Sequence, residues 1–280
     1  MSHRARPLPL ATAAGILLVV GCTARAPTGS DAGKPLVVVT TSVLESAVRE
    51  VGGDRVAVFR MLPPSSCPGH FDLKPQDFER IARSRLVFRH DYQAHLEKKL
   101  KEAGTEAKRI VVIRVDGPET IPEHFAAACR TVGAALSELL PASAGEFERN
   151  VAEAERRMAA LDEQMRVKLA AIKGRRVLVS QHQTEFCRWC GLDVVGSFDT
   201  AGDTSLKELG ELVTAAKQRG VVGVVANRQR GTREADALAE KLSVPVVVLS
   251  NFPDANAGQK TMADMIRSNC DMLVSGIPHG

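Results

Sequence analysis

The sequence has few aromatic residues, little net charge and no recognisable catalytic motif. Aromatic residues make up 4% of the 280-residue chain, which argues against a surface that stacks nucleic-acid bases or sugar rings. The formal net charge of +4 is too small to indicate a nucleic-acid partner. No nucleophile triad, phosphate-binding glycine loop or pair of catalytic carboxylates stands out. We therefore expect a binding protein that is not an enzyme and that has no nucleic-acid partner.

The N-terminus has the composition of an export signal followed by a tether. A mostly apolar run, Pro7–Val20, follows a short basic region and is too short to span a bilayer as a permanent helix. It ends in Gly21-Cys22, which resembles the processing site of a bacterial lipoprotein. We expect residues 1–22 to be a lipoprotein signal peptide, with lipidation at Cys22, and residues 23–34 to be a flexible tether. An ordinary secretory signal is the alternative.

This signal predicts an exported protein that is anchored in the cell membrane by its N-terminal lipid and faces the periplasm or the cell exterior. No later segment has enough uninterrupted apolar residues to cross a membrane.

Beyond the tether, short β-branched runs alternate with helical patterns, as expected for parallel α/β layers. Strands are predicted at Leu36–Thr40, Arg55–Leu62, Leu86–Phe88, Ile110–Ile113, Val177–Ser180, Val221–Val225 and Val244–Leu249. Helices are predicted at Ser42–Val51, Pro75–Arg83, Thr204–Arg219, Thr232–Leu242 and Thr261–Val274.

A different pattern separates the two groups of strands. From Phe147 to Ile172 the apolar residues recur every three or four positions, and no Pro or Gly interrupts them before Gly174. This pattern predicts one amphipathic helix of roughly 28 residues, about 40 Å long at 1.5 Å per residue. A coiled coil is the alternative, but fewer than five heptads between α/β units favour an intramolecular helix. The predicted fold is α/β, with two parallel-sheet lobes (35–142 and 174–280) joined by one long rigid helix (143–173).

A thiol and an imidazole lie three residues apart in a loop stiffened by Pro and Gly. Cys67 and His70 follow the run Leu62-Pro63-Pro64, just past a predicted strand, where open α/β sheets place their sites. Thiolate and imidazole are ligands that zinc and copper prefer. The loop therefore predicts half of a metal site, and a polar turn that carries both residues by chance is the alternative.

At this point the chain resembles the metal-binding lipoproteins of bacterial ABC importers, the zinc and manganese solute-binding family whose two lobes are joined by one helix. The likeness runs from Pro35 to Val274 and is best at Val51–Val56, at Gly69–Pro75, at Ala135–Leu139 and at Gly191–Gly196. It implies that a transition-metal ion is captured between the lobes and delivered to an ABC transporter permease. His70 takes the place of the first metal-binding histidine of the family. We expect a monomer.

The other ligands of the family do not carry over. Its second histidine falls near Gly117, which leaves only His124 nearby. Its third falls near Gln181 and His182, and its final acidic ligand falls near Ser250-Asn251. The histidine-rich loop of many zinc members is absent.

We therefore predict a metal site drawn from the residues Cys67, His70, His182, Gln181 and His124. The neutral side chains that replace acidic ligands favour softer ions, so zinc is expected before manganese. The alternatives are a metal chelate or a small organic molecule bound on the same scaffold, and a thiol-redox protein that works through Cys187 and Cys190.

The remaining cysteines and histidines have less specific surroundings. Cys187 and Cys190 fall one helical turn apart, which suits a disulfide or a redox pair, with burial in the core as the alternative. His90 is expected at the surface, although it could face the cleft.

Overall fold

Two parallel sheets built from β-branched runs organise the chain. The computed structural model describes Met1 and residues 33–68, 71, 73–104, 109–199 and 206–279. Within these residues the first sheet has the strand order β2-β1-β3-β4, formed by β1 (Leu36–Val39), β2 (Ala57–Arg60), β3 (Leu86–His90) and β4 (Ile110–Ile113). The second has the order β6-β5-β7-β8, formed by β5 (Arg176–Ser180), β6 (Asp193–Phe198), β7 (Gly223–Asn227) and β8 (Val246–Leu249). The predicted α/β class with two parallel sheets is confirmed.

The two sheets therefore share one topology, in which the first strand of each lies between the second and the third. Every described strand pair is parallel, so the carboxyl ends of the strands meet at one edge of each sheet. We name the first sheet with its helices the N-lobe and the second sheet with its helices the C-lobe.

The sequence pattern predicts no strand at β6, because Asp193 and Gly196 interrupt the run of apolar residues in this segment. The structure gives that glycine a packing role. A Cβ at Gly196 would lie 2.7 Å from Cδ2 of Leu212, so only glycine allows the helix α7 (Leu206–Arg219) to pack this closely on β6.

Short helices connect the strands, and several begin at residues that satisfy free backbone groups. The N-lobe contains α1 (Ser42–Gly52), α2 (Pro75–Arg83), α3 (Glu97–Glu102) and α4 (Pro122–Leu139), with 3-10 turns at Gly53–Arg55 and Asp91–Leu96. The C-lobe contains α6 (Thr184–Trp189), α7, α8 (Arg233–Leu242) and α9 (Met262–Gly276), with 3-10 turns at Gln181–Gln183 and Ala255–Ala257. The hydroxyl of Thr41 caps α1 by accepting from the N–H of Leu44 at 3.4 Å.

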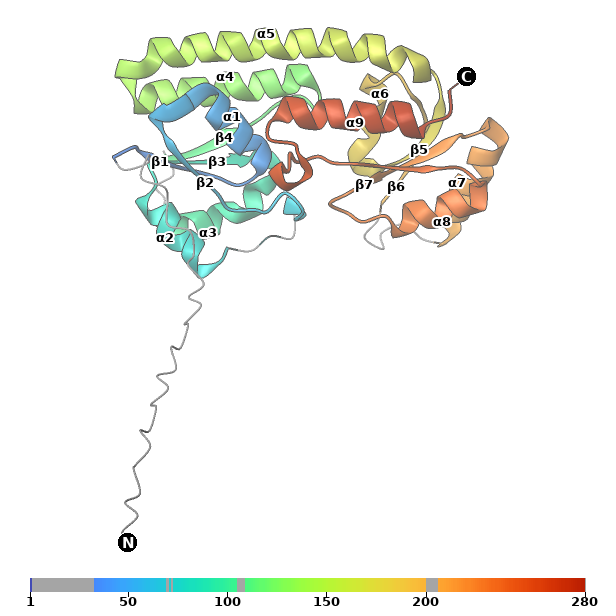
Figure 1. Cartoon of the computed structure of the whole chain (residues 1–280), viewed down its shortest axis with the longest axis horizontal. Helices are drawn as coiled ribbons and strands as arrows, with labels where there is room; N and C mark the ends of the chain where they lie inside the picture. Colours follow the sequence, from blue (N-terminus) through green and yellow to red (C-terminus); the bar gives the residue numbers. More distant parts are fainter. Residues whose placement is uncertain (2–32, 69–70, 72, 105–108, 200–205, 280) are drawn as a thin grey trace. The chain divides into compact units, whose positions relative to one another are not determined.

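One long helix, α5 (Ala144–Leu169), joins the lobes, as predicted. It has 26 residues and continues at both ends into 3-10 turns, Pro141–Ser143 and Ala170–Ile172. It packs along α1 and α4 of the N-lobe and against α9 of the C-lobe (Figure 1). The approach to α4 is close, because a Cβ at Gly133 would lie 2.5 Å from Cγ2 of Val151.

Packing links both lobes to this helix. One cluster of buried apolar side chains includes residues of both sheets and the buried face of α5. Trp189 at the end of α6 stacks on Phe186 and donates from its indole N–H to Asp162 of α5 at 2.8 Å. The N–H of Met262 donates to the hydroxyl of Ser46 across the lobes at 3.0 Å. No helix in the described part of the chain is long and apolar enough to cross a membrane.

Candidate functional site

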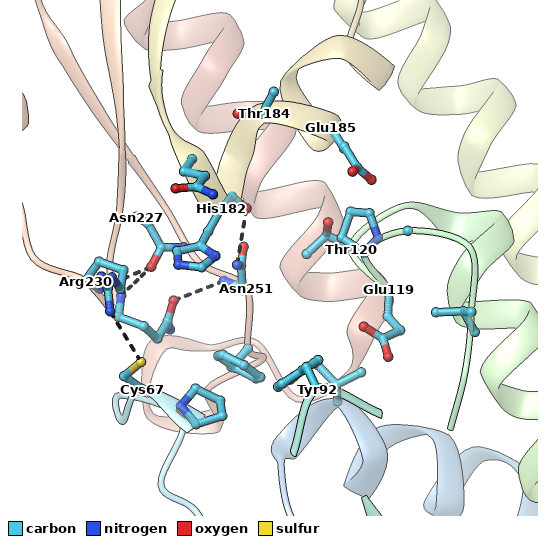
Figure 2. Close-up of a pocket in the computed structure, with 18 of the residues that line it drawn as sticks. Cys67, Tyr92, Glu119, Thr120, His182, Thr184, Glu185, Asn227, Arg230 and Asn251 are labelled. Atoms are coloured by element: carbon cyan, nitrogen blue, oxygen red, sulfur yellow. Dashed lines mark hydrogen bonds between the residues drawn. The ribbon is translucent and has the colours of Figure 1, made fainter. Parts of the chain in front are cut away.

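A cavity of about 760 Å³ lies between the two lobes, at the carboxyl ends of both sheets. Its N-lobe wall includes side chains that follow β2, β3 and β4, among them Cys67, Tyr92, Glu119 and Thr120 (Figure 2). Its C-lobe wall includes side chains at or just after the ends of β5, β7 and β8, among them His182, Asn227, Arg230 and Asn251. The parallel topology thus brings together residues from distant parts of the sequence.

Three of the predicted metal-site residues line this cavity. Cys67 lies on the N-lobe wall, and Gln181 and His182 lie on the C-lobe wall. His70 and the predicted lipidation site Cys22 lie outside the described residues.

His124 is not among the residues that line the cavity. Its Nδ1 is 3.1 Å from the carbonyl oxygen of Pro118, and a Cβ at Gly117 would lie 2.4 Å from its Cε1. The ring therefore packs against the loop that carries Gly117, and a glycine is needed there to make room for it.

The prediction that His90 lies at the surface is wrong. The side chain is 1% exposed, because β3 lies between β1 and β4 and His90 is still paired in register with Ile113. Its Nδ1 lies 2.8 Å from Oε1 of Glu119, and its Nε2 lies 2.8 Å from the hydroxyl of Thr41. The ring of Tyr92 stacks on it at 4.9 Å between centroids.

These contacts shape the electrostatics of the N-lobe wall. Burial opposes ionisation of Glu119, but the hydrogen bond and charge of His90 outweigh it and lower the pKa of the carboxyl. The pKa of Tyr92 is raised well above its usual value by desolvation of its hydroxyl, although the residue as a whole is 54% exposed, and by the nearby acidic groups Glu119, Asp91 and Cys67. The wall therefore carries a fixed carboxylate beside a neutral phenol.

Four neutral amide side chains line the C-lobe wall: Gln181, Asn227, Gln229 and Asn251. The buried side chain of Asn227 accepts from the N–H groups of Gln229 and Arg230, at 3.0 and 3.1 Å, and so fixes the turn after β7. The amide of Gln229 donates to the hydroxyl of Ser250 at 2.9 Å and to the carbonyl of Pro64 in the N-lobe at 3.0 Å. This last bond joins the two walls directly.

A second contact between the walls involves the guanidinium of Arg230. It donates to Oδ1 of Asp199 at 2.6 Å and faces the sulfur of Cys67 at 3.9 Å. Burial and the charge of Arg230 lower the pKa of His182, against a smaller opposing effect of Asp199. His182 is thereby kept neutral, which is the form of histidine that binds a metal.

The described residues do not assemble a complete metal site. No group of three His, Cys, Asp or Glu side chains that could hold an ion occurs among them. The thiol of Cys67 and the imidazole of His182 face the same cavity from opposite walls, so an ion held by both would bridge the lobes.

The thiols of Cys187 and Cys190 are buried and free in this structure. Burial raises the pKa of both, and a hydrogen bond with the thiol of Cys270 raises that of Cys190 further. These surroundings favour the protonated thiol over the reactive thiolate. The predicted disulfide or redox pair stays a prediction.

Two charged pairs of the cavity are missing from the sequence-based prediction. His90 and Glu119 are 29 residues apart, and Asp199 and Arg230 are 31 apart. No local pattern connects the members of either pair. Each pair forms only once the order of strands in its sheet is set: β4 lies beside β3, whereas β5 lies between β6 and β7. The position of His90 at the end of a predicted strand was the one available signal.

Comparison with known proteins places the chain in a family. The sequence profile of the family described as zinc-uptake complex component A, periplasmic (ZnuA), matches residues 37–276. The zinc-binding protein TroA of Treponema pallidum (strain Nichols) is 24% identical over 280 aligned positions, which cover 88% of this chain and 89% of TroA.

Solved structures show the same fold. A zinc-bound deletion mutant of ZnuA superposes with a TM-score of 0.75 at 17% identity, over 88% of this chain and 99% of that chain. Periplasmic zinc-binding protein TroA from Treponema pallidum gives 0.74 at 18%, over 87% and 99%. A manganese-bound mutant of a periplasmic metal-binding protein from Candidatus Liberibacter asiaticus gives 0.72 at 14%, over 86% and 99%. Because the family profile covers most of its length, the chain belongs to the ZnuA family of periplasmic zinc-uptake components.

Proposed function

We propose that this protein is an extracytoplasmic binding protein, not an enzyme, that captures a transition-metal ion in the cavity between its lobes. The observation that carries the proposal is the placement of Cys67 and His182 on opposite walls of one cavity at the carboxyl ends of both sheets. Thiolate and neutral imidazole favour zinc, and the relatives TroA and ZnuA are zinc-binding by name. Manganese, which prefers oxygen ligands, is the less suitable ion.

The delivery route and the anchor are part of the same proposal. A zinc-uptake component hands its ion to a membrane partner, so we propose an ABC transporter permease as the partner of this chain. The lipid at Cys22 would hold the monomeric protein at the membrane while residues 23–34 act as a tether. His70, next to Cys67 in sequence, is proposed as a further ligand, with Gln181 and His124 as weaker candidates.

Metal titration of the purified protein tests the proposal. We expect wild type to bind about one zinc ion per chain, and more tightly than Mn(II). His70→Ala and His182→Ala should each weaken zinc binding by roughly tenfold or more, which corresponds to about 1.4 kcal/mol. His95→Ala serves as a control, because this histidine does not line the cavity.

Three outcomes would contradict it. Absence of zinc binding by wild type would reject the metal function and favour a metal chelate or an organic ligand. Such a ligand is also compatible with the lack of three grouped metal-binding side chains among the described residues. Unchanged affinity in either variant would remove that histidine from the site. Tighter binding of Mn(II) than of zinc would overturn the selectivity.

A further inference from the structure

The loop that carries Cys67 is held by both lobes. At its start, the N–H of Leu62 donates to the carbonyl oxygen of Thr40, next to β1, at 3.0 Å. Two residues later, the carbonyl oxygen of Pro64 accepts from the side-chain amide of Gln229 in the C-lobe, also at 3.0 Å. Cys67 follows three residues after Pro64, so the place of its thiol depends on the C-lobe as well as on its own lobe.

The sequence of this loop limits the ways in which it can be held. Proline has no backbone N–H, so Pro63 and Pro64 can join backbone hydrogen bonds only through their carbonyl oxygens. The carbonyl oxygen of Pro63 is used inside the loop, where it accepts from the N–H of Ser66 at 3.0 Å. The carbonyl oxygen of Pro64 is left for a donor from outside the loop, and Gln229 supplies that donor.

The side chain of Gln229 is itself fixed on the C-lobe wall. Its Nε2 donates to the hydroxyl of Ser250 at 2.9 Å, and its Oε1 accepts from the N–H of Asn251 at 3.2 Å. Together with the bond to Pro64, these contacts use both amide hydrogens and the amide oxygen, so turning the amide over would break all three bonds. The N–H of Gln229 is held in turn by the side chain of Asn227. The amide is therefore a rigid arm that reaches from the C-lobe to the N-lobe.

A second contact holds the same loop. Sγ of Cys67 lies 3.9 Å from Nη1 of Arg230, which follows Gln229 in sequence and is paired with Asp199. Cys67 is thus placed against the wall that carries His182, the other candidate ligand on the cavity lining. A site that is held in its binding geometry before the ligand arrives does not have to be ordered during binding.

We propose that Gln229 is a positioning residue, whose side-chain amide straps the Cys67 loop to the C-lobe wall and so sets the spacing of the two walls around the captured ion. The proposal rests on the metal-binding function proposed above. While the bond to Pro64 is closed, the ion is held from both lobes. Separation of the lobes breaks this bond and withdraws Cys67 from the ion. Loss of the bond should therefore speed release more than it slows capture.

Gln229→Met tests this role, because methionine keeps the length of the side chain and removes its hydrogen-bonding groups. In the zinc-free protein, we expect the backbone amides of residues 65–67 to exchange with deuterium roughly fivefold faster than in wild type, as measured by mass spectrometry. In the zinc-loaded protein, stopped-flow transfer of zinc to a chromogenic chelator should show release roughly fivefold faster, with little change in the association rate.

Gln259→Met is the matched control. Gln259 is another buried glutamine of the C-lobe, but its amide donates to Ser268 of the same lobe at 3.1 Å and it does not line the cavity. Exchange of residues 65–67 and release of zinc should be the same in this variant as in wild type, even if its midpoint of urea unfolding falls. A loss of stability alone therefore does not produce the result expected for Gln229→Met.

Unchanged exchange of residues 65–67 in Gln229→Met, or unchanged release of zinc, would overturn the positioning role and leave the metal function standing. Wild type that binds no zinc would overturn the metal function, whereas the exchange rates would still decide whether Gln229 holds the loop. If Gln229→Met does not fold, Gln229→Asn replaces it, because that side chain is one methylene group shorter and does not span from the C-lobe wall to Pro64.

Discussion

The two walls of the cavity occupy equivalent places in two sheets of the same topology, yet they differ in chemistry. At the end of β3, His90 and Glu119 form a buried ionisable pair. At the end of β7, the corresponding strand, Asn227 begins a network of neutral amides. Topology therefore decides where polar groups gather, and individual residues decide what they do. The N-lobe wall concentrates negative charge and a thiol, whereas the C-lobe wall provides a rigid frame with a neutral imidazole.

The largest expected effect is a difference in alkylation rate between the cysteine of the cavity wall and the cysteines of the interior. Cys67 is partly exposed at the N-lobe wall, whereas Cys129, Cys187, Cys190 and Cys270 are at most 2% exposed. We expect iodoacetamide to modify Cys67 of the native protein at least about a hundredfold faster than those four, which react only after local unfolding. Peptide mapping by mass spectrometry measures the rates.

Zinc should protect Cys67 in the same experiment if the thiol is a ligand. Comparable labelling of a buried thiol would show that the core around that thiol opens readily, and unchanged labelling of Cys67 with zinc would exclude this thiol from the metal site.

The next largest effect is a loss of stability at the C-lobe wall, around the side-chain amide of Asn227. In Asn227→Ala, the N–H groups of Gln229 and Arg230 lose their shared acceptor, and we expect the free energy of unfolding to fall by about 2 kcal/mol. Urea denaturation measures this loss. Asn256→Ala, at an exposed turn, should leave stability unchanged. A stable Asn227→Ala protein would show that the C-lobe wall is not the rigid frame that the comparison assigns to it.

A smaller effect is expected on the opposite wall. Thr41→Val removes the hydroxyl that caps α1 and contacts His90, which should lower the free energy of unfolding by about 1 kcal/mol. Thr41→Ser keeps the hydroxyl and should retain most of the stability. A Thr41→Val protein that unfolds at the same urea concentration as wild type would show that the hydroxyl contributes nothing measurable to stability.

The smallest expected change in stability concerns Glu50, a carboxylate outside the cavity, which we compare with Glu119 in the cavity. Glu50 on α1 pairs with Arg157 of α5 at 2.7 Å, but burial outweighs this partner and raises the pKa of Glu50. A raised pKa means that the folded state holds the proton more tightly than the unfolded state, so stability is lost as pH rises through the folded pKa.

Glu50→Gln should therefore be more stable than wild type by a few tenths of a kcal/mol at pH 7, and this advantage should vanish in acid below the unfolded pKa. Glu148→Gln, an exposed position on α5, is the control. A variant that is less stable at pH 7 would show that the ion pair outweighs burial. Glu50 would then resemble Glu119, whose pKa is lowered.

The fold could be predicted from the sequence because its signals are local. β-branched runs, helix caps and the period of the long helix each depend on residues that are close along the chain. The strand β6 was not predicted, because Gly196 interrupts the apolar pattern of a strand. Its role is to allow close packing of a helix, and that contact is not visible in the local sequence. The positions of Cys67 and His182 at the cavity could be predicted from strand ends alone, whereas the partners of His90 and Arg230 depend on the order of strands in each sheet.

The contact between Trp189 and Asp162 gives the protein an optical reporter of its own. The sequence contains one tryptophan, and that indole joins α6, directly after the C-lobe wall, to the helix α5 that both lobes share. The tryptophan fluorescence of the protein therefore reports on one place, the contact between α6 and α5. Any rotation of α6 against α5 during ion uptake would change the hydrogen bond to Asp162 and, with it, the emission. Capture and release could be followed in real time in the unlabelled protein.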